Sequence, residues 1–216
     1  MPIPAMFERP PSPAIVSIPG HFGDIMSKRD TTLTLPEGFS GFERMLLTAN
    51  GNLQRLISAY FNMTVSVQIL ENTQVELTPD EEPTVFARFQ REVNLICNKK
   101  IVCNAKSQVL VKDQQVYDLV VNKGVGIGQI FRYLDRLPSF ELHGLGRTEQ
   151  TFWREYSLRI PGVDCRLLEV MPSALFDEGW LERAEETINW EVDINAPTTE
   201  STFVWQNSQQ EPATKK

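Results

Sequence analysis

The stretch Thr84 to Val111, TVFARFQREVNLICNKKIVCNAKSQVLV, predicts a β-hairpin and with it a fold built on an antiparallel sheet. Its first arm carries apolar side chains at every second position, which is the period of a half-buried strand: Val85, Ala87, Phe89, Val93, Leu95 and Cys97. Arg91 falls in the same register, so we expect its side chain to point to the apolar face. Lys99 and Lys100 are typical of the solvated turn between the two arms.

A guanidinium on a buried face requires a partner that compensates for its lost hydration. The usual partners are a carboxylate of the protein and the carboxylate of a ligand. Arg91 is therefore a candidate clamp for an anionic ligand. Two structural explanations fit the same pattern: a satisfied ion pair in the core, or an arginine near the sheet edge whose stem reaches solvent.

The segments around the hairpin predict an α+β fold with one domain at residues 38–188. A proline-rich arm, residues 1–37, precedes it, and a polar tail, residues 189–216, follows it and is expected to be disordered from about residue 195. Two short helices are expected within 38–62, with a break at Asn50 and Gly51. Periodicity further predicts strands at 64–72, 84–97, 101–111, 115–121, 139–146, 150–160 and 164–171, and helices at 129–136 and 173–188. Neighbouring strands joined by short turns imply an antiparallel sheet.

The chain has 216 residues and a net charge of −7, which disfavours nucleic acid as a partner because binding a polyanion normally needs a concentrated basic surface. A small-molecule substrate is the expected partner, and a monomer is compatible with the sequence. No stretch approaches the roughly 20 apolar residues that span a bilayer. Prolines interrupt the N-terminal region where a signal peptide has its apolar run, so the expected location is cytoplasmic.

Sequence motifs for the common cofactors are missing. Gly124, Gly126 and Gly128 suggest a nucleotide site, but Gln129 stands where a dinucleotide fingerprint needs glycine. The sequence also contains no Walker motif, nucleophile elbow or metal-spaced histidine pair, so we expect neither a cofactor nor a metal. The glycine amides at the start of a helix can still donate hydrogen bonds to a carboxylate. The three cysteines are too few for a disulfide scaffold, although two of them flank the hairpin turn and could pair.

Glu169 is the single acid in the stretch from Cys165 to Pro172 and shares a face with Cys165, Leu167 and Met171. A carboxyl group among apolar side chains is suited to general acid or base catalysis if a substrate reaches it. The structural alternative is an ion pair between Glu169 and Arg91, and periodicity does not separate the two.

Seven short motifs occur along the chain in a fixed order. They are MLLTANGN at 45–52, QREVNL at 90–95, GIGQIF at 126–131, FEL at 140–142, GR at 146–147, FWR at 152–154 and LEVMPSALF at 168–176. In this order and spacing the chain resembles the chorismate lyase family from about Phe42 to Phe176. The resemblance implies a six-stranded antiparallel sheet with helices packed on one side and a site enclosed beneath helical flaps.

The resemblance also implies an activity: elimination of pyruvate from chorismate, or from a close analogue, to give a hydroxybenzoate without a cofactor. Arg91 and Glu169 would be the catalytic residues, with Arg91 pairing with the substrate carboxylate and Glu169 at the opposite end. The remaining substrate contacts that it implies are Arg147, near the enolpyruvyl carboxylate, and the backbone around Asn52, Ile127 and Gly128.

Two other functions are compatible with the same residues, because relatives that share a fold need not share a substrate. Asn52 stands where the family often has a bulkier apolar residue. One alternative is a specialised biosynthetic enzyme, such as a cyclase, dehydratase or pericyclase, that uses the same pocket on another small molecule. The other is a small-molecule binding module, since the same fold serves as an effector-sensing domain in bacterial regulators.

Overall fold

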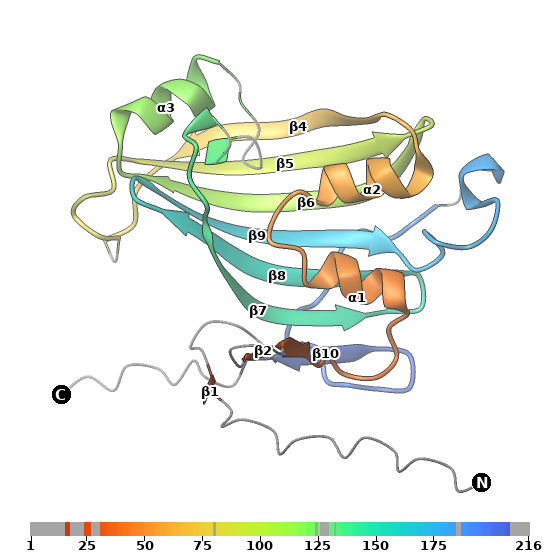
Figure 1. Cartoon of the computed structure of the whole chain (residues 1–216). Coiled ribbons are helices and arrows are strands. Elements are labelled where there is room, and N and C mark those ends of the chain that lie inside the picture. The colour runs from red at the N-terminus through yellow and green to blue at the C-terminus, as the bar shows by residue number, and fades with distance from the viewer. Residues whose placement is uncertain are drawn as a thin grey trace, which may run out of the picture.

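The computed structural model describes residues 16–17, 24–26, 31–79, 81–123, 125, 130–131, 133–184 and 187–207. The described part of the chain forms an α+β fold around one large antiparallel sheet (Figure 1). The sheet contains seven strands in the order β10-β7-β8-β9-β6-β5-β4. Their bounds are β4 Val65–Val75, β5 Ala87–Cys97, β6 Lys100–Val111, β7 Ser139–Arg147, β8 Thr151–Ile160, β9 Val163–Pro172 and β10 Phe203–Gln206.

The hairpin predicted from Thr84 to Val111 is confirmed as β5 and β6, which pair antiparallel along their whole length. The two helices expected within 38–62 are also confirmed, as α1 (Gly41–Leu47) and α2 (Leu53–Phe61). A capping box fixes the start of α1, where Ser40 and Glu43 each bond the other's backbone N–H. Gly51 and Asn52 both have positive φ, of 66° and 59°, and turn the chain sharply between the two helices.

Two predicted elements are wrong. The segment expected to be a strand at 115–121 is the helix α3 (Gln114–Val121), because Asp113 caps its first turn by accepting bonds from the amides of Gln115 and Val116. Its buried residues also follow helical spacing: Val116, Leu119 and Val120. The closing helix expected at 173–188 is reduced to turns and a single 3-10 turn, η1 (Trp180–Glu182).

The sheet has one strand more than the six expected. Six strands come from residues 65–172, and the seventh, β10, comes from the C-terminal tail, so residues 203–206 are not disordered as expected. β10 pairs with β7 at the edge of the sheet. Gly146 makes this pairing possible, because a Cβ there would collide with the carbonyl of Phe203 and with the ring of Trp153.

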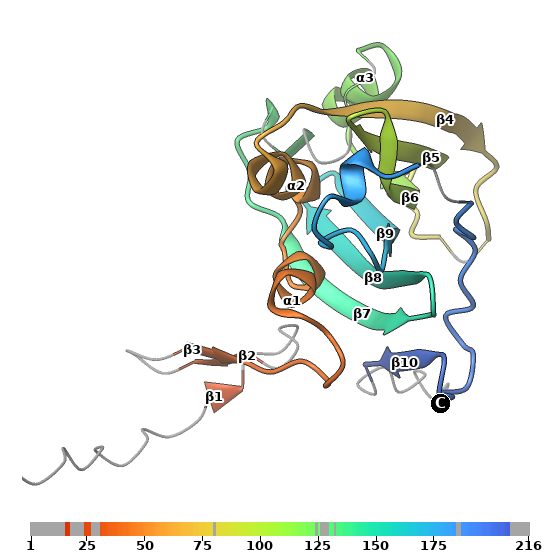
Figure 2. The ribbon, with the colours of Figure 1, turned by 90° about the vertical axis from the view of Figure 1, so that its right-hand side faces the viewer.

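The two faces of the sheet differ in what covers them. Helices α1 and α2 lie against one face, called here the inner face (Figure 2). β6 and β7 follow one another as strands along the chain, but β9 and β8 lie between them in the sheet. The connection between β6 and β7 contributes Ile130 and Phe131 to the core. The opposite, outer face carries mostly polar and charged side chains, as is common for an antiparallel sheet with one solvated face.

The N-terminal arm contributes three short strands, β1 (Val16–Ser17), β2 (Asp24–Met26) and β3 (Thr31–Leu33), which form a separate small antiparallel sheet. The other residues of the arm up to residue 30 lie outside the described residues. No helix within the described part of the chain is long and apolar enough to cross a membrane.

Candidate functional site

Two rows of side chains cross the inner face at the centre of the sheet. Directly opposed residues of antiparallel strands share a face, so the register defines each row. The first row runs from β5 to β8 through Arg91, Ser107, Leu167 and Tyr156. The second row runs through Val93, Ala105, Glu169 and Arg154. The sheet therefore brings Arg91 and Glu169, the two residues expected to be catalytic, onto the same face in adjacent rows.

Arg91 is buried on β5, as its register predicts, and is only 5% exposed. Its Nη1 donates a hydrogen bond to the carbonyl of Val125 at 3.4 Å, and its Nε has no hydrogen-bond partner among the described residues. No carboxylate of the described residues pairs with it. Burial lowers the pKa of Arg91 because it penalises the charged form. A buried cation with a spare donor is the arrangement that an anionic ligand would complete.

Glu169 is not paired with Arg91, so that structural alternative is wrong. Its Oε2 accepts a hydrogen bond from Nε of Arg154 at 2.7 Å, and its Oε1 accepts one from the hydroxyl of Tyr156 at 2.9 Å. The expectation that apolar side chains alone surround Glu169 is also wrong, because the neighbouring strand β8 supplies both polar partners. Both carboxylate oxygens are thus fixed in position.

Arg154 is fully buried and makes more contacts than any other charged residue of the site. Its Nη1 donates to the carbonyls of Ala49 at 2.6 Å and Leu47 at 3.3 Å, and its guanidinium lies 4.3 Å from the centre of the Tyr156 ring. Burial is the largest single effect and opposes its charge, but Glu169, Tyr156 and Cys103 together outweigh burial and raise the pKa of Arg154. Its Nη2 has no partner among the described residues.

Sequence reasoning assigned no role to Arg154 or Tyr156, although a signal was present. Like Arg91, Arg154 stands in a row of apolar residues at every second position of its strand. In the strand of Arg154 these residues are Phe152, Tyr156, Leu158 and Ile160. The signal is hidden because residues 151–154 are all buried, so this part of the strand shows no alternation of apolar and polar side chains.

Arg91 and Glu169 are separated by two strand spacings across the sheet and two residues along it, which places their Cα atoms roughly 12 Å apart. Between them the inner face carries the small side chains of Ala105 and Ser107 on β6. Both side chains therefore lie on the same side of the sheet, with a cation at one position and a carboxylate at the other. The arrangement suits a small ligand with a carboxylate at one end and a hydroxyl at the other.

Arg147 ends β7 on the inner face but lies away from Arg91. Four strand spacings separate the two arginines, so their Cα atoms are roughly 20 Å apart. Arg147 has protein partners: its Nη2 lies 3.5 Å from Oε1 of Glu43, its Nη1 donates to the carbonyl of Gly38, and its guanidinium lies 5.6 Å from the centre of the Phe39 ring. It therefore secures the start of α1.

The remaining predicted contacts lie at the helices and the glycine-rich loop. Asn52 is the N-cap of α2, where its carbonyl accepts from the amides of Arg55 and Leu56, while its side chain makes no capping bond. Ile127 and Gly128 lie outside the described residues, as do Gly124, Gly126 and Gln129.

The three cysteines are free and buried. Cys97 is opposite Lys100 and Cys103 is opposite Leu95 in the hairpin register, so the two cysteines are not paired across the turn. Burial, reinforced by Asp164, raises the pKa of Cys165 to about 12, although Arg91 acts in the other direction. The Cys165 thiol is therefore protonated at neutral pH and does not supply the missing anion for Arg91.

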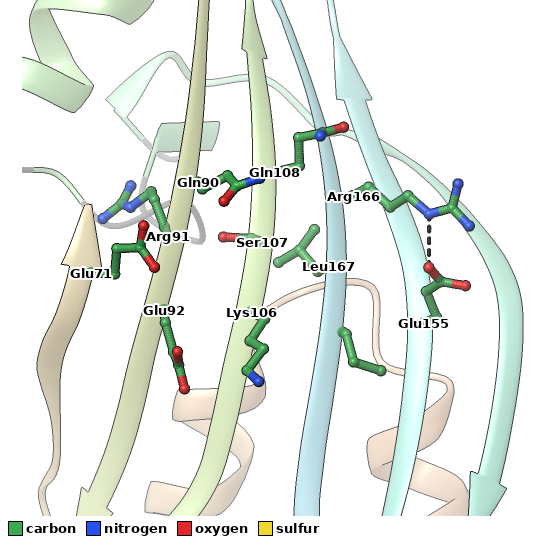
Figure 3. A pocket seen from close by; sticks show the side chains of 11 residues that line it. Glu71, Gln90, Arg91, Glu92, Lys106, Ser107, Gln108, Glu155, Arg166 and Leu167 are labelled. Atoms are coloured by element: carbon green, nitrogen blue, oxygen red, sulfur yellow. Dashed lines mark hydrogen bonds and ion pairs between the residues drawn. The ribbon is translucent and has the colours of Figure 1, made fainter. Parts of the chain in front are cut away.

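A hollow of about 460 Å³ lies on the outer face and is distinct from this site (Figure 3). Charged side chains from five strands surround it, and several of them are already paired. Arg166 bonds Glu155 at 2.8 Å, and Lys106 bonds Glu191 at 2.5 Å. Arg91 and Leu167 also line the hollow, but their register places their side chains on the inner face. The hollow thus has the character of a solvated sheet face.

No group of three or more histidine, cysteine, aspartate or glutamate side chains in the described ranges is arranged to hold a metal ion. No protein-family model matches the chain, and no curated protein matches it.

Proposed function

We propose that the chain is a lyase that eliminates pyruvate from chorismate, or from a close analogue, to give a hydroxybenzoate. The observation that carries the proposal is Arg91, a buried cation with an unpaired Nε and no carboxylate partner among the described residues. Its place on the same face as Glu169 supports the proposal further. The order of the seven motifs adds the resemblance to the chorismate lyase family.

In this proposal Arg91 binds the ring carboxylate through a charge-assisted hydrogen bond. Glu169 accepts a hydrogen bond from the ring hydroxyl and is held in place by Arg154 and Tyr156. The bond between the ring and the enolpyruvyl oxygen breaks, the ring loses one hydrogen as it becomes aromatic, and the methylene carbon of the leaving group gains one. Pyruvate and the hydroxybenzoate together contain all the atoms of chorismate, so the step needs no oxidant. Orientation and electrostatics account for the catalysis.

A second candidate is favoured by the contacts of Arg147. Chorismate has two carboxylates, yet Arg147 is held by Glu43 and Gly38 roughly 20 Å from Arg91. A substrate with a single carboxylate would need Arg91 alone. The second candidate is therefore a biosynthetic enzyme, such as a cyclase, dehydratase or pericyclase, that acts on another small acid in the same pocket.

The test is incubation of the purified protein with chorismate, with pyruvate and hydroxybenzoate both measured over time. The lyase is expected to release them in equal amounts, and Arg91→Ala and Glu169→Gln are expected to abolish release while the variants stay folded by circular dichroism. Arg166→Ala is the matched control, because it removes an arginine from β9 on the outer face. Its rate should equal that of the wild type.

The other outcomes separate the alternatives. A folded wild-type protein that releases no pyruvate rejects the lyase and leaves the second candidate. Binding of 4-hydroxybenzoate by calorimetry without turnover, lost in Arg91→Ala, favours a binding module with the same clamp.

A further inference from the structure

Helix α1 is fixed at both ends by arginines of the sheet. At its start, Arg147 of β7 contacts the Glu43 carboxylate and the carbonyl of Gly38. At its end, Arg154 of β8 donates to the carbonyls of Leu47 and Ala49. The last carbonyls of a helix have no partner within the helix, so a cation at this position both satisfies them and complements the helix dipole.

The arginine at the end of α1 is also the one that holds Glu169. Nη1 of Arg154 contacts the turn after α1, while Nε of the same guanidinium contacts Glu169. A guanidinium is a rigid plane, so these two nitrogen atoms cannot move independently. If Glu169 moves and shifts or tilts the guanidinium plane, the hydrogen bonds from Arg154 to the carbonyls of Leu47 and Ala49 change as well.

The turn between α1 and α2, residues 48–52, has few other polar contacts with the sheet. The side chain of Asn50 donates to the carbonyl of Pro138 at 3.5 Å, which is long for a hydrogen bond. A Cβ added at Gly51 would lie 3.8 Å from Leu158, so the turn passes close to β8 at this point. The two positive-φ residues in the turn, Gly51 and Asn52, make its conformation dependent on such anchors.

We propose that Arg154 is a positioning residue that couples Glu169 to the turn at residues 48–52. A ligand that hydrogen-bonds to Glu169 shifts the guanidinium plane and alters the hold on the turn, and the anchored turn in return fixes the orientation of Glu169. Such coupling between two positions is reciprocal. The proposal rests on the proposed function only in that Glu169 contacts the ligand; the link between Glu169 and the turn is a property of the ligand-free protein.

Hydrogen exchange of the backbone amides in residues 48–57 tests the link without any ligand. Glu169→Gln removes the charge that holds Arg154, so exchange in this segment should accelerate on the order of tenfold, with the amides of β5 and β6 unchanged. Glu155→Gln is the matched control: it neutralises the partner of Arg166 across the same two strands on the outer face. It should leave the turn unchanged. Equal exchange in Glu169→Gln and the wild type, or an equal effect of the control, overturns the proposal.

If Glu169→Gln does not fold, a second variant tests the coupling between Glu169 and the turn. Arg154→Lys keeps a positive charge for Glu169 but removes the rigid plane in which Nε holds the carboxylate while Nη1 holds the turn. Exchange at residues 48–57 should rise in this variant, and unchanged exchange contradicts the coupling.

A ligand experiment extends the test. Addition of 4-hydroxybenzoate should change exchange of the turn in the wild type and leave it unaltered in Arg154→Lys at saturating ligand. If 4-hydroxybenzoate does not bind the wild type, the proposed function fails, while the ligand-free comparison still decides the coupling. If it binds and the two proteins respond alike, the coupling fails and the proposed function stands.

Discussion

Arg154 and Glu169 are directly opposed on β8 and β9, and Nε of the arginine lies 2.7 Å from Oε2 of the glutamate. This pair leaves Arg91 as a buried cation without an oppositely charged partner in the described part of the chain. The inner face of the sheet therefore has an excess of positive charge although the whole chain carries a net charge of −7. A local excess of positive charge of this kind favours an anionic ligand through the position of one arginine. The electrostatic field of the whole chain, which is negative, does not favour it.

Replacement of Arg91 by methionine should stabilise the ligand-free protein while it abolishes ligand binding. The arginine loses hydration on burial and, among the described residues, regains one long hydrogen bond, to Val125. Methionine fills a similar volume without that cost, so the free energy of unfolding should rise by about 1 to 2 kcal/mol. Urea denaturation of Arg91→Met and the wild type measures the change. A loss of stability would mean that Arg91 has a structural partner in the folded protein.

Replacement of Arg154 by methionine should have the opposite effect. It leaves Glu169 buried without its counter-ion and two carbonyls at the end of α1 without a donor. Removal of one partner of a buried ion pair typically costs about 3 to 5 kcal/mol of unfolding free energy.

The control for Arg154 is Arg166→Met, which breaks an arginine–glutamate pair between the same two strands on the outer face. Because the Arg166 side chain is half exposed, this change should cost less than about 1 kcal/mol. Similar losses in the two variants, measured by urea denaturation, would show that burial does not distinguish the two pairs.

The sequence predicted the hairpin, the inward position of Arg91 and both helices before β4, because each depends on local periodicity or on a turn. It did not predict the partner of Glu169. Which residue of β8 stands opposite Glu169 depends on the register of two strands, and a shift of one residue would place Glu155 there instead of Arg154.

The errors also have physical causes. The segment at 115–121 contains residues that suit a strand, but the side chain of Asp113 caps the first turn and so stabilises the helix α3 there. β10 is a short strand whose formation depends on pairing with β7, so its four residues carry little signal of their own.

Gly146→Ala should displace β10 from the sheet. The added Cβ would lie 2.6 Å from the Trp153 ring and would also collide with the carbonyl of Phe203, a backbone atom of β10 itself. Overpacking of this kind costs about 1 to 3 kcal/mol. Limited proteolysis should then cleave the variant near residues 203–206 faster than the wild type.

Gly144→Ala provides the comparison on the same strand. A Cβ there would approach the carbonyl of Trp205 to 3.0 Å, which requires only a small adjustment. Its cleavage rate should lie between those of the wild type and Gly146→Ala. Equal protection of β10 in all three proteins would contradict the role assigned to Gly146.

The protein should lose stability as the pH falls through the range in which an unfolded histidine takes up a proton, and His143 should account for part of that loss. His143 is buried on β7, with Nε2 at 2.6 Å from Oγ of Ser157. Burial lowers the pKa of His143 below its ordinary value of 6.5, although Glu141 acts in the other direction. The unfolded chain therefore binds a proton at a higher pH than the folded protein does. The stabilisation is complete above pH 6.5 and is lost as the pH falls from there towards the lower pKa of the folded state.

The free energy of unfolding, measured in urea at a series of pH values from about 8 to about 5.5, should fall more steeply in the wild type than in His143→Gln. His21→Gln, which replaces the other of the two histidines, should keep the wild-type dependence if His143 is responsible. Parallel curves for the wild type and His143→Gln would mean that the pKa of His143 is the same in the folded and unfolded chains. In that case burial beside Ser157 would not disfavour the charged imidazole.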